Sequence, residues 1–179
     1  MRQNRMLRKK REMDEADVER FLLEAKIGRL GVCQNNEPYV VPVLFVYDLE
    51  TEAIYVHSSK KGRKIEMIRK NPKVCFEIDE MSNVVIGESP CNCNVIYRSV
   101  IVFGEASFIN NSLEKIKMLN MFMRKYANET NGVPVTSEMT NNTQIIMVKI
   151  VSKTGKENKG NRNSEVQIRS FWAKSLSSA

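Results

Sequence analysis

The stretch from Tyr55 to Lys64 concentrates more groups capable of chemistry than any other part of this chain. It contains the only histidine of the protein, His57, followed by two serines, a glycine and four cationic side chains. An apolar run from Ala53 to Val56 leads into it, so the pattern predicts a strand that ends in a polar loop and opens a helix. Hydroxyls, loop amides and cations at a helix start suit an anion, most often a phosphate. A solvated basic turn accounts for the same residues equally well, and this stretch alone leaves both interpretations open.

The rest of the sequence excludes several kinds of metal site and several catalytic motifs. A single histidine excludes a polyhistidine metal site and leaves His57 as the sole histidine that could activate a nucleophile. The nucleophile-elbow, P-loop and dinucleotide-binding glycine motifs do not occur. Cys91 and Cys93 form a lone Cys-x-Cys, which does not complete a zinc site, so no metal is expected. We interpret the two thiols as free, with a redox role as the alternative. If the protein is an enzyme, we expect a cofactor to supply the reactivity.

The positive charge of the chain lies at its two ends. Residues 1–11 carry six Lys or Arg and no acid, and residues 152–179 carry six more with only Glu157 and Glu165 as acids. Residues 12–151 then hold 16 basic and 19 acidic side chains, although the whole chain has a net charge of +7. We interpret the ends as solvated arms and expect no nucleic-acid partner, with a basic arm that touches nucleic acid as the minor alternative.

Length and hydropathy favour a single globular domain. A chain of 179 residues can bury a sizeable core as one domain. No apolar run approaches the roughly 20 residues of a membrane span. The basic N-terminus continues into acidic residues rather than an apolar segment, so a secretory signal is not indicated and we expect a cytoplasmic protein without a membrane partner.

Periodicity predicts the elements that would position the His57 stretch. We expect a first helix capped by Asp14 and broken by Gly28, a short helix capped by Ser59, and a third helix that opens at Asn111 with Glu114. The expected strands cover residues 27–33, 38–47, 53–58, 73–79, 95–109 and 143–153. Helices and strands do not alternate regularly, which favours a small antiparallel barrel with peripheral helices.

Some local signals refine this prediction. Pro38 and Pro42 lie inside one apolar run, and because proline has no amide hydrogen for the ladder, that run is expected to be an edge strand or a bulged strand. Gly104 predicts a bulge in the long fifth strand. Residues 81–94 resemble a loop, which we interpret as a lid over a ligand.

Several segments, in chain order, together resemble a known family. They are Arg8–Met13, Gly28–Gly31, Pro38–Val43, Ile54–Ser58 with Gly62 and Lys64, Asn71–Glu77, Tyr97–Val100 with Phe103 and Gly104, and Thr154–Glu157. Their order and spacing across about residues 6–157 are similar to the flavin-nucleotide-binding split-barrel proteins, specifically the nitroimidazole-resistance branch of the pyridoxamine 5'-phosphate oxidase-like group. The resemblance implies a mainly β fold with peripheral helices, a six-stranded antiparallel split β-barrel. We expect it over residues 14–157, between a basic N-terminal arm (1–13) and a basic C-terminal tail (158–179).

The resemblance also implies a homodimer with FMN in each of two clefts between the subunits. The phosphate would contact Ser58, Ser59, Gly62, Arg63 and Lys64, and the isoalloxazine would lie along the backbone of Tyr39, Val40, Val41, Pro42 and Val43. Tyr97, Arg98 and Ser99 would approach the flavin across the interface, although Tyr97 as a core strand residue is an equal alternative. His57 would face the cleft as the catalytic residue that binds substrate or donates a proton, or it would be structural and hydrogen-bond the loop or the phosphate.

Three functional hypotheses follow. The first is an FMN-dependent oxidoreductase that reduces a small acceptor such as a nitroaromatic. The second is a non-catalytic flavin- or haem-binding module, in which His57 would be the axial ligand of a haem iron. The third is a regulatory protein that uses its basic arms on nucleic acid. The residues do not identify the physiological substrate, the electron donor, or whether pyridoxal compounds bind.

Overall fold

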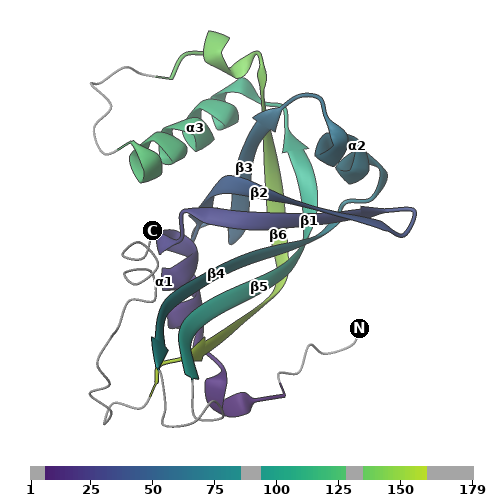
Figure 1. Ribbon diagram of the computed structural model, residues 1–179. Helices are drawn as coiled ribbons and strands as arrows, with labels where there is room; N and C mark the ends of the chain where they lie inside the picture. The colour runs from purple at the N-terminus through teal and green to yellow at the C-terminus, as the bar shows by residue number, and fades with distance from the viewer. Residues whose placement is uncertain (1–6, 86–93, 128–134, 161–179) are drawn as a thin grey trace, which may run out of the picture.

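Six antiparallel strands close into one barrel, and three α-helices pack outside it (Figure 1). The computed structural model describes residues 7–85, 94–127 and 135–160. The strands are β1 (Ile27–Gln34), β2 (Glu37–Asp48), β3 (Ala53–Ser59), β4 (Lys73–Val85), β5 (Asn94–Ile109) and β6 (Thr143–Asn158). The α-helices are α1 (Glu15–Glu24), α2 (Arg63–Lys70) and α3 (Ser112–Tyr126), with short 3-10 turns at η1 (Lys9–Arg11) and η3 (Glu138–Thr140). The predicted six-stranded antiparallel barrel with peripheral helices is confirmed.

The barrel is closed unevenly, in the order β1-β2-β3-β6-β5-β4. Strand β1 pairs with β4 only over Arg29–Val32, whereas β5 pairs with both of its neighbours along most of its length. Strand β2 pairs with β1 over Glu37–Leu44 and with β3 only over Phe45–Asp48. The first part of β2, which contains both prolines, therefore has a partner on one side only, as an edge strand does.

Two apolar clusters lie on opposite faces of β3. The barrel interior holds Ile54 and Val56, while Ala53 and Tyr55 belong to a second cluster between the sheet and α3. Successive side chains of a strand point to opposite faces. This alternation continues past the apolar run, so buried Ser58 lies on the inner row and exposed His57 on the outer row. The strand thus delivers its two candidate polar residues to different faces of the sheet.

The helix caps follow the predictions in two cases of three. The side chain of Asp14 accepts a hydrogen bond from the Asp17 amide at 2.7 Å, and Asn111 accepts one from the Glu114 amide at 3.0 Å. The prediction for Ser59 was wrong, because the residue at the N-cap of α2 is Gly62, with a φ of 121°. Such a φ is open to glycine but strained for other residues, which explains why the chain turns into α2 there.

Other boundaries differ from those predicted. Helix α1 ends at Glu24, and Gly28 lies inside β1 rather than ending the helix. A Cβ atom at Gly28 would stand 2.1 Å from the ring of Phe76, so the glycine makes room for this core aromatic. The expected loop over residues 81–94 is strand up to Val85, because the β4–β5 hairpin extends beyond the barrel.

Of the remaining local predictions, the bulge at Gly104 is confirmed, the end of the last strand is wrong, and the lid lies partly outside the described residues. The register between β5 and β6 shifts between Phe103 and Gly104, which confirms the predicted bulge. Strand β6 continues to Asn158, beyond the predicted end. Cys91, Cys93 and the rest of the proposed lid from residue 86 lie outside the described residues, as does the tail from residue 161. No helix among the described residues is both long and apolar enough to span a membrane.

Candidate functional site

The ring of His57 is held against α3 at the end of β3. It packs edge-on to Phe122, with ring centroids 4.8 Å apart and an interplanar angle of 84°. Partial burial and the nearby Lys64 ammonium lower the pKa of His57 below its usual value. Because the ordinary histidine pKa is about 6.5, the imidazole is largely neutral at pH 7, with one nitrogen as donor and the other as acceptor.

The hydroxyl of Ser58 is a buried polar group without a hydrogen-bond partner among the described residues. An unsatisfied buried hydroxyl is costly, and native proteins keep few of them. Ser59, on the exposed row, accepts only a long hydrogen bond from the Lys61 amide at 3.4 Å. Both hydroxyls therefore retain donor capacity, on opposite faces of β3.

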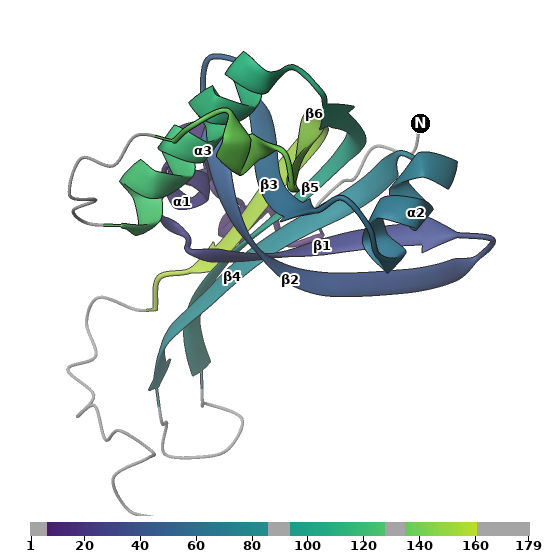
Figure 2. The ribbon, with the colours of Figure 1, turned by 90° about the horizontal axis from the view of Figure 1, so that it is seen from above.

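Helix α2 starts directly after these serines and lies against the β1–β2 hairpin (Figure 2). The guanidinium of Arg63 forms an ion pair with Glu37 at 2.5 Å and lies 4.9 Å from the ring centre of Tyr39. Arg63 therefore fixes the helix to β2. Among the described residues, no carboxylate lies within ion-pair distance of Lys64, which is half-buried beside His57.

The edge of β2 next to this loop presents alternating side chains. Tyr39, Val41 and Val43 are half-buried and pack against the barrel core, whereas Val40 and Pro42 point outward and are exposed. Because Glu37–Leu44 pairs only with β1, the backbone groups on its other side have no strand partner in the described part of the chain. Tyr39, Arg63 and the β3 end thus form one contiguous region, which we call the β3–α2 site.

Tyr97, Arg98 and Ser99 lie far from the β3–α2 site. Ser58 pairs with Gln144 of β6, and Arg98 pairs with Glu157 near the other end of the same strand. At ~3.3 Å per residue, the path from Gln144 to Glu157 is roughly 40 Å along the strand. Within one copy of the chain, Ser58 and Arg98 therefore lie beside opposite ends of β6.

These distant residues have structural partners of their own. Arg98 pairs with Glu24 at 2.9 Å and Glu80 at 2.7 Å, and it lies 4.1 Å from the ring centre of Phe21, so it holds α1 on the sheet. The hydroxyl of Tyr97 accepts a hydrogen bond from Arg11 at 3.5 Å.

The phenol of Tyr97 lies between two cations. Burial raises the pKa of Tyr97, but hydrogen bonds to Arg11 and Lys156 outweigh burial, and the net pKa lies below the usual value. No local sequence pattern indicates that Arg11 reaches this position.

Sequence reasoning missed two partners within the β3–α2 site. They are Phe122 of α3 and Glu37, the first residue of β2. Each contacts a predicted site residue that is distant in sequence, so only the fold pairs them. The helical stripe containing Phe122 was the one available signal, since it showed that this ring faces the sheet.

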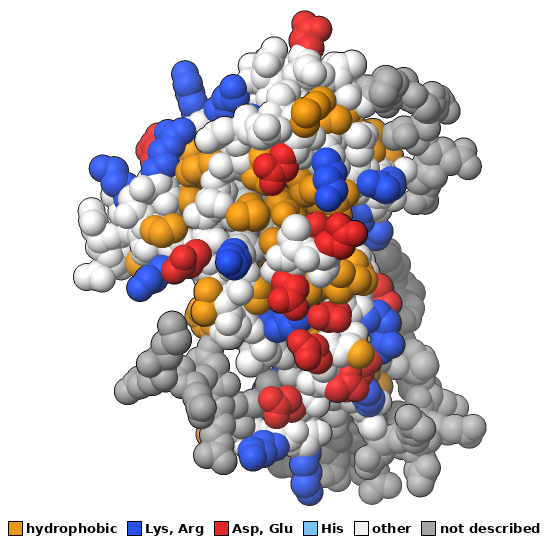
Figure 3. All heavy atoms as spheres, turned by 180° about the vertical axis from the view of Figure 1, so that it is seen from behind, with side chains coloured by type: hydrophobic (Ala, Val, Ile, Leu, Met, Phe, Trp, Pro, Cys, Tyr) orange, Lys and Arg blue, Asp and Glu red, His pale blue; other side chains and the backbone are white. Residues whose placement is uncertain are grey.

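One face of the described residues carries charges of both signs. Figure 3 shows acidic side chains interspersed with basic ones over hydrophobic surface, on the described part of the face opposite that of Figure 1. Binding to a phosphate backbone favours a continuous basic patch.

Comparisons with known proteins agree with this architecture. A candidate 5-nitroimidazole antibiotic resistance protein from Bacteroides thetaiotaomicron superimposes with a TM-score of 0.69 at 26% identity, covering 81% of this chain and 85% of that one. A flavocytochrome from Azotobacter vinelandii gives a TM-score of 0.72 at 23% identity, covering 82% and 68%. A FAD and haem binding protein from Mycobacterium smegmatis gives 0.75 at 14%, covering 84% and 74%. At these lower identities the last two show the fold alone.

Sequence comparisons assign the family. An uncharacterized protein of Rhizobium meliloti is 28% identical over 94 residues, which are 52% of this chain and 54% of that protein, so the chain spans about half the length of this curated relative. The model of the pyridoxamine 5'-phosphate oxidase family matches residues 14–157. The predicted family is thereby confirmed: this chain is a split-barrel member of the pyridoxamine 5'-phosphate oxidase family.

Proposed function

We propose that the protein is a flavin-binding oxidoreductase whose flavin phosphate is held at the β3–α2 site. The observation that carries this proposal is Lys64 at the start of α2, which lies beside His57 and lacks an ion-pair partner among the described residues. A phosphate would pair with this ammonium, because charge-assisted hydrogen bonds to phosphate are among the strongest in proteins. Family membership and structural relatives that bind flavin support the same assignment.

FMN is the specific flavin that we propose. Its single phosphate would be held by Ser58, Ser59 and Lys64, with the backbone at Gly62 approaching closely because that residue has no side chain. Arg63 is already paired with Glu37, so it would contribute only by exchanging this partner. That exchange is inexpensive, since exposed ion pairs stabilise proteins by about 0–1 kcal/mol.

The isoalloxazine would lie along the edge of β2. In the described part of the chain, the backbone of Tyr39–Val43 has no strand partner on the side away from β1, which leaves amide and carbonyl groups for the polar edge of the ring. The exposed side chains of Val40 and Pro42 offer apolar contact beside it.

We propose that the flavin site is completed by a second copy of the chain. Along β6, Tyr97, Arg98 and Ser99 are roughly 40 Å from the position that pairs with Ser58, so in this proposal those of a partner subunit approach the same flavin. The outer face of the sheet exposes apolar side chains suited to such an interface: Val40 (61% exposed), Ile101 (41%), Phe103 (42%) and Val151 (57%).

The bound flavin would accept electrons from a donor and pass them to a small acceptor, for which we propose a nitroaromatic compound. His57 would lie at the edge of this region with a neutral imidazole, able to hydrogen-bond the acceptor and to relay a proton to it. Phe122 would fix the orientation of the ring.

The first experiment is a visible absorbance spectrum of the purified protein, with the released cofactor identified by mass spectrometry. Flavin absorbance with FMN released would support the proposal and justify assays with nitroaromatic acceptors. A Soret band would favour a haem-binding module, with His57 as the ligand to test. A colourless protein that also takes up no added FMN would overturn the flavin assignment. A stable flavoprotein that reduces no acceptor would favour a non-catalytic flavin carrier.

A further inference from the structure

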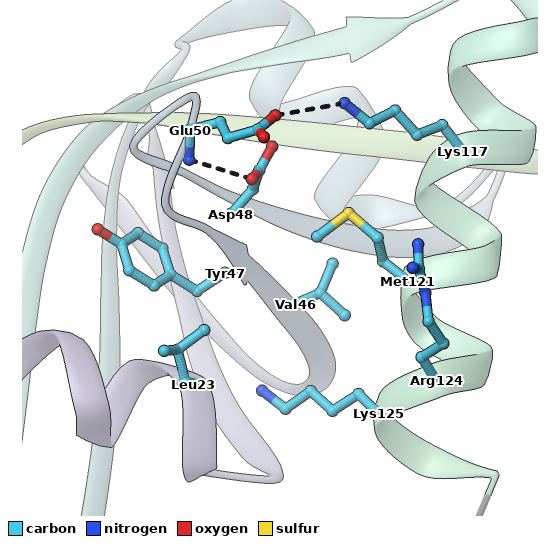
Figure 4. A pocket seen from close by; sticks show the side chains of 9 residues that line it. All are labelled: Leu23, Val46, Tyr47, Asp48, Glu50, Lys117, Met121, Arg124 and Lys125. Atoms are coloured by element: carbon cyan, nitrogen blue, oxygen red, sulfur yellow. Dashed lines mark hydrogen bonds and ion pairs between the residues drawn. The ribbon is translucent and has the colours of Figure 1, made fainter.

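A pocket separate from the β3–α2 site opens between α1, α3 and the turn that joins β2 to β3. Its volume is about 440 Å³, within the range of small-molecule sites. Residues of α1, β2, the turn after β2 and α3 line it (Figure 4). Leu23, Val46 and Met121 make part of the wall apolar, and acidic and basic side chains make up most of the rest.

The two acidic residues of the pocket are already engaged. The carboxylate of Asp48 accepts hydrogen bonds from the Glu50 amide at 3.2 Å and from the Thr51 hydroxyl at 3.0 Å, which stabilises the turn. Glu50 itself forms an ion pair with Lys117 at 3.9 Å, drawn as a dashed line in Figure 4. Neither acid therefore neutralises the other cations of the pocket.

Those cations are Arg124 and Lys125, and among the described residues no carboxylate lies within ion-pair distance of either. Lys125 extends across the pocket from α3, with its ammonium 4.0 Å from the ring centre of Phe45 and 3.4 Å from the carbonyl oxygen of Leu22. Burial and the nearby Lys26 lower the pKa of Lys125 to about 8. An ammonium held in this position gains from any anion that reaches it.

We propose that this pocket binds a small amphiphilic carboxylate. Its carboxylate would lie between Arg124 and Lys125, and its apolar body would cover Leu23, Val46 and Met121. A cationic ligand would meet only acids that are already paired, and a highly charged phosphate ester would leave the apolar wall uncovered. The assignment does not depend on the flavin, because the lining residues are distinct from those of the β3–α2 site.

The test uses the full-length protein with whatever cofactor it carries, titrated with octanoate by isothermal calorimetry. Octanol and octylammonium have the same chain without the negative charge and serve as ligand controls. The variant Lys125→Met keeps an unbranched apolar side chain but removes the ammonium. Lys73→Met, at an exposed position on β4, is the matched control variant.

We expect saturable octanoate binding that weakens about tenfold or more in Lys125→Met and is unchanged in Lys73→Met. The methyl resonance of Met121, assigned by its loss in Met121→Leu, should shift on titration, which places the ligand in this pocket. Absence of saturable binding, equal binding to Lys125→Met, or equal affinity for octanol would each overturn the proposal. Because the readouts are calorimetric and local, they stand independently of any flavin-dependent activity.

Discussion

At the residue scale, His57 is informative because it is the only histidine, so its imidazole resonances need no assignment. Burial is the main cause of its lowered pKa, and Lys64 adds to it. The native state therefore binds the histidine proton more weakly than the unfolded chain does. By linkage, the contribution of His57 to stability is present above about pH 6.5 and is lost as the pH falls through the lower, native pKa.

We expect an NMR titration of the full chain to give a pKa below about 6.5 for His57. Replacing Phe122 with alanine should raise this pKa, because the ring that covers the imidazole is lost. Met123→Ala, at an exposed position of the same helix, is the matched control and should leave the titration unchanged. A wild-type pKa at or above the ordinary value would contradict the packing of His57 against α3.

Lys64 and Arg63 are adjacent residues with different surroundings, so their variants should differ. Lys64→Gln should weaken FMN binding about tenfold or more, because an unpaired ammonium is lost from the proposed phosphate site. Arg63→Gln should weaken it less, because Arg63 is held by Glu37.

Fluorescence titration of the cofactor-free protein with FMN measures both affinities. Lys61→Gln, at an exposed loop position, is the control. If the wild type and Lys64→Gln bound FMN with equal affinity, the assignment of the phosphate to the β3–α2 site would be wrong.

At the element scale, the junction of β3 and α2 depends on Gly62. No atom lies within 4 Å of a Cβ built at this residue, so a substitution there acts through the backbone conformation alone. We expect Gly62→Ala to lower the free energy of unfolding by about 1–3 kcal/mol and to weaken FMN binding, because the start of α2 must shift. Urea unfolding followed by circular dichroism measures the first effect.

The control is Lys61→Ala, at a residue whose φ is not positive, and it should leave the free energy of unfolding nearly unchanged. If Gly62→Ala also left the free energy of unfolding unchanged, α2 could begin without this turn.

At the scale of the whole molecule, the separation of the two groups of proposed flavin ligands makes a prediction about assembly. Lys64→Gln and Tyr97→Ala should each impair flavin binding in a homodimer, because each affects both clefts. A two-fold heterodimer can be formed from one Lys64→Gln chain and one Tyr97→Ala chain. One of its clefts then carries both substitutions, and the other cleft carries none.

We expect the heterodimer, co-expressed and purified through two different tags, to recover about half of the wild-type flavin content. Sedimentation should show a dimer throughout. Flavin content no higher than in the variant homodimers, or a monomeric protein that binds flavin fully, would show that one chain builds the site by itself.

The sequence alone determined the local features of this protein. Asp14 and Asn111 cap helices because a side-chain oxygen meets an amide a few residues away, and Gly104 marks a bulge in its own strand. Two prolines in one strand identified the edge of β2, since proline cannot donate to a ladder. The order of short segments along the chain also sufficed to predict the family and the barrel.

Only the tertiary structure decided which distant residues meet. The contacts of His57 with Phe122 and of Arg63 with Glu37 depend on how helices dock on the barrel, and no local pattern encodes that docking. The same is true of the pocket around Lys125, whose walls come from three separate elements. The separation of Tyr97 from the β3–α2 site follows from the length of β6 in the closed sheet, a property of the whole barrel rather than of any segment.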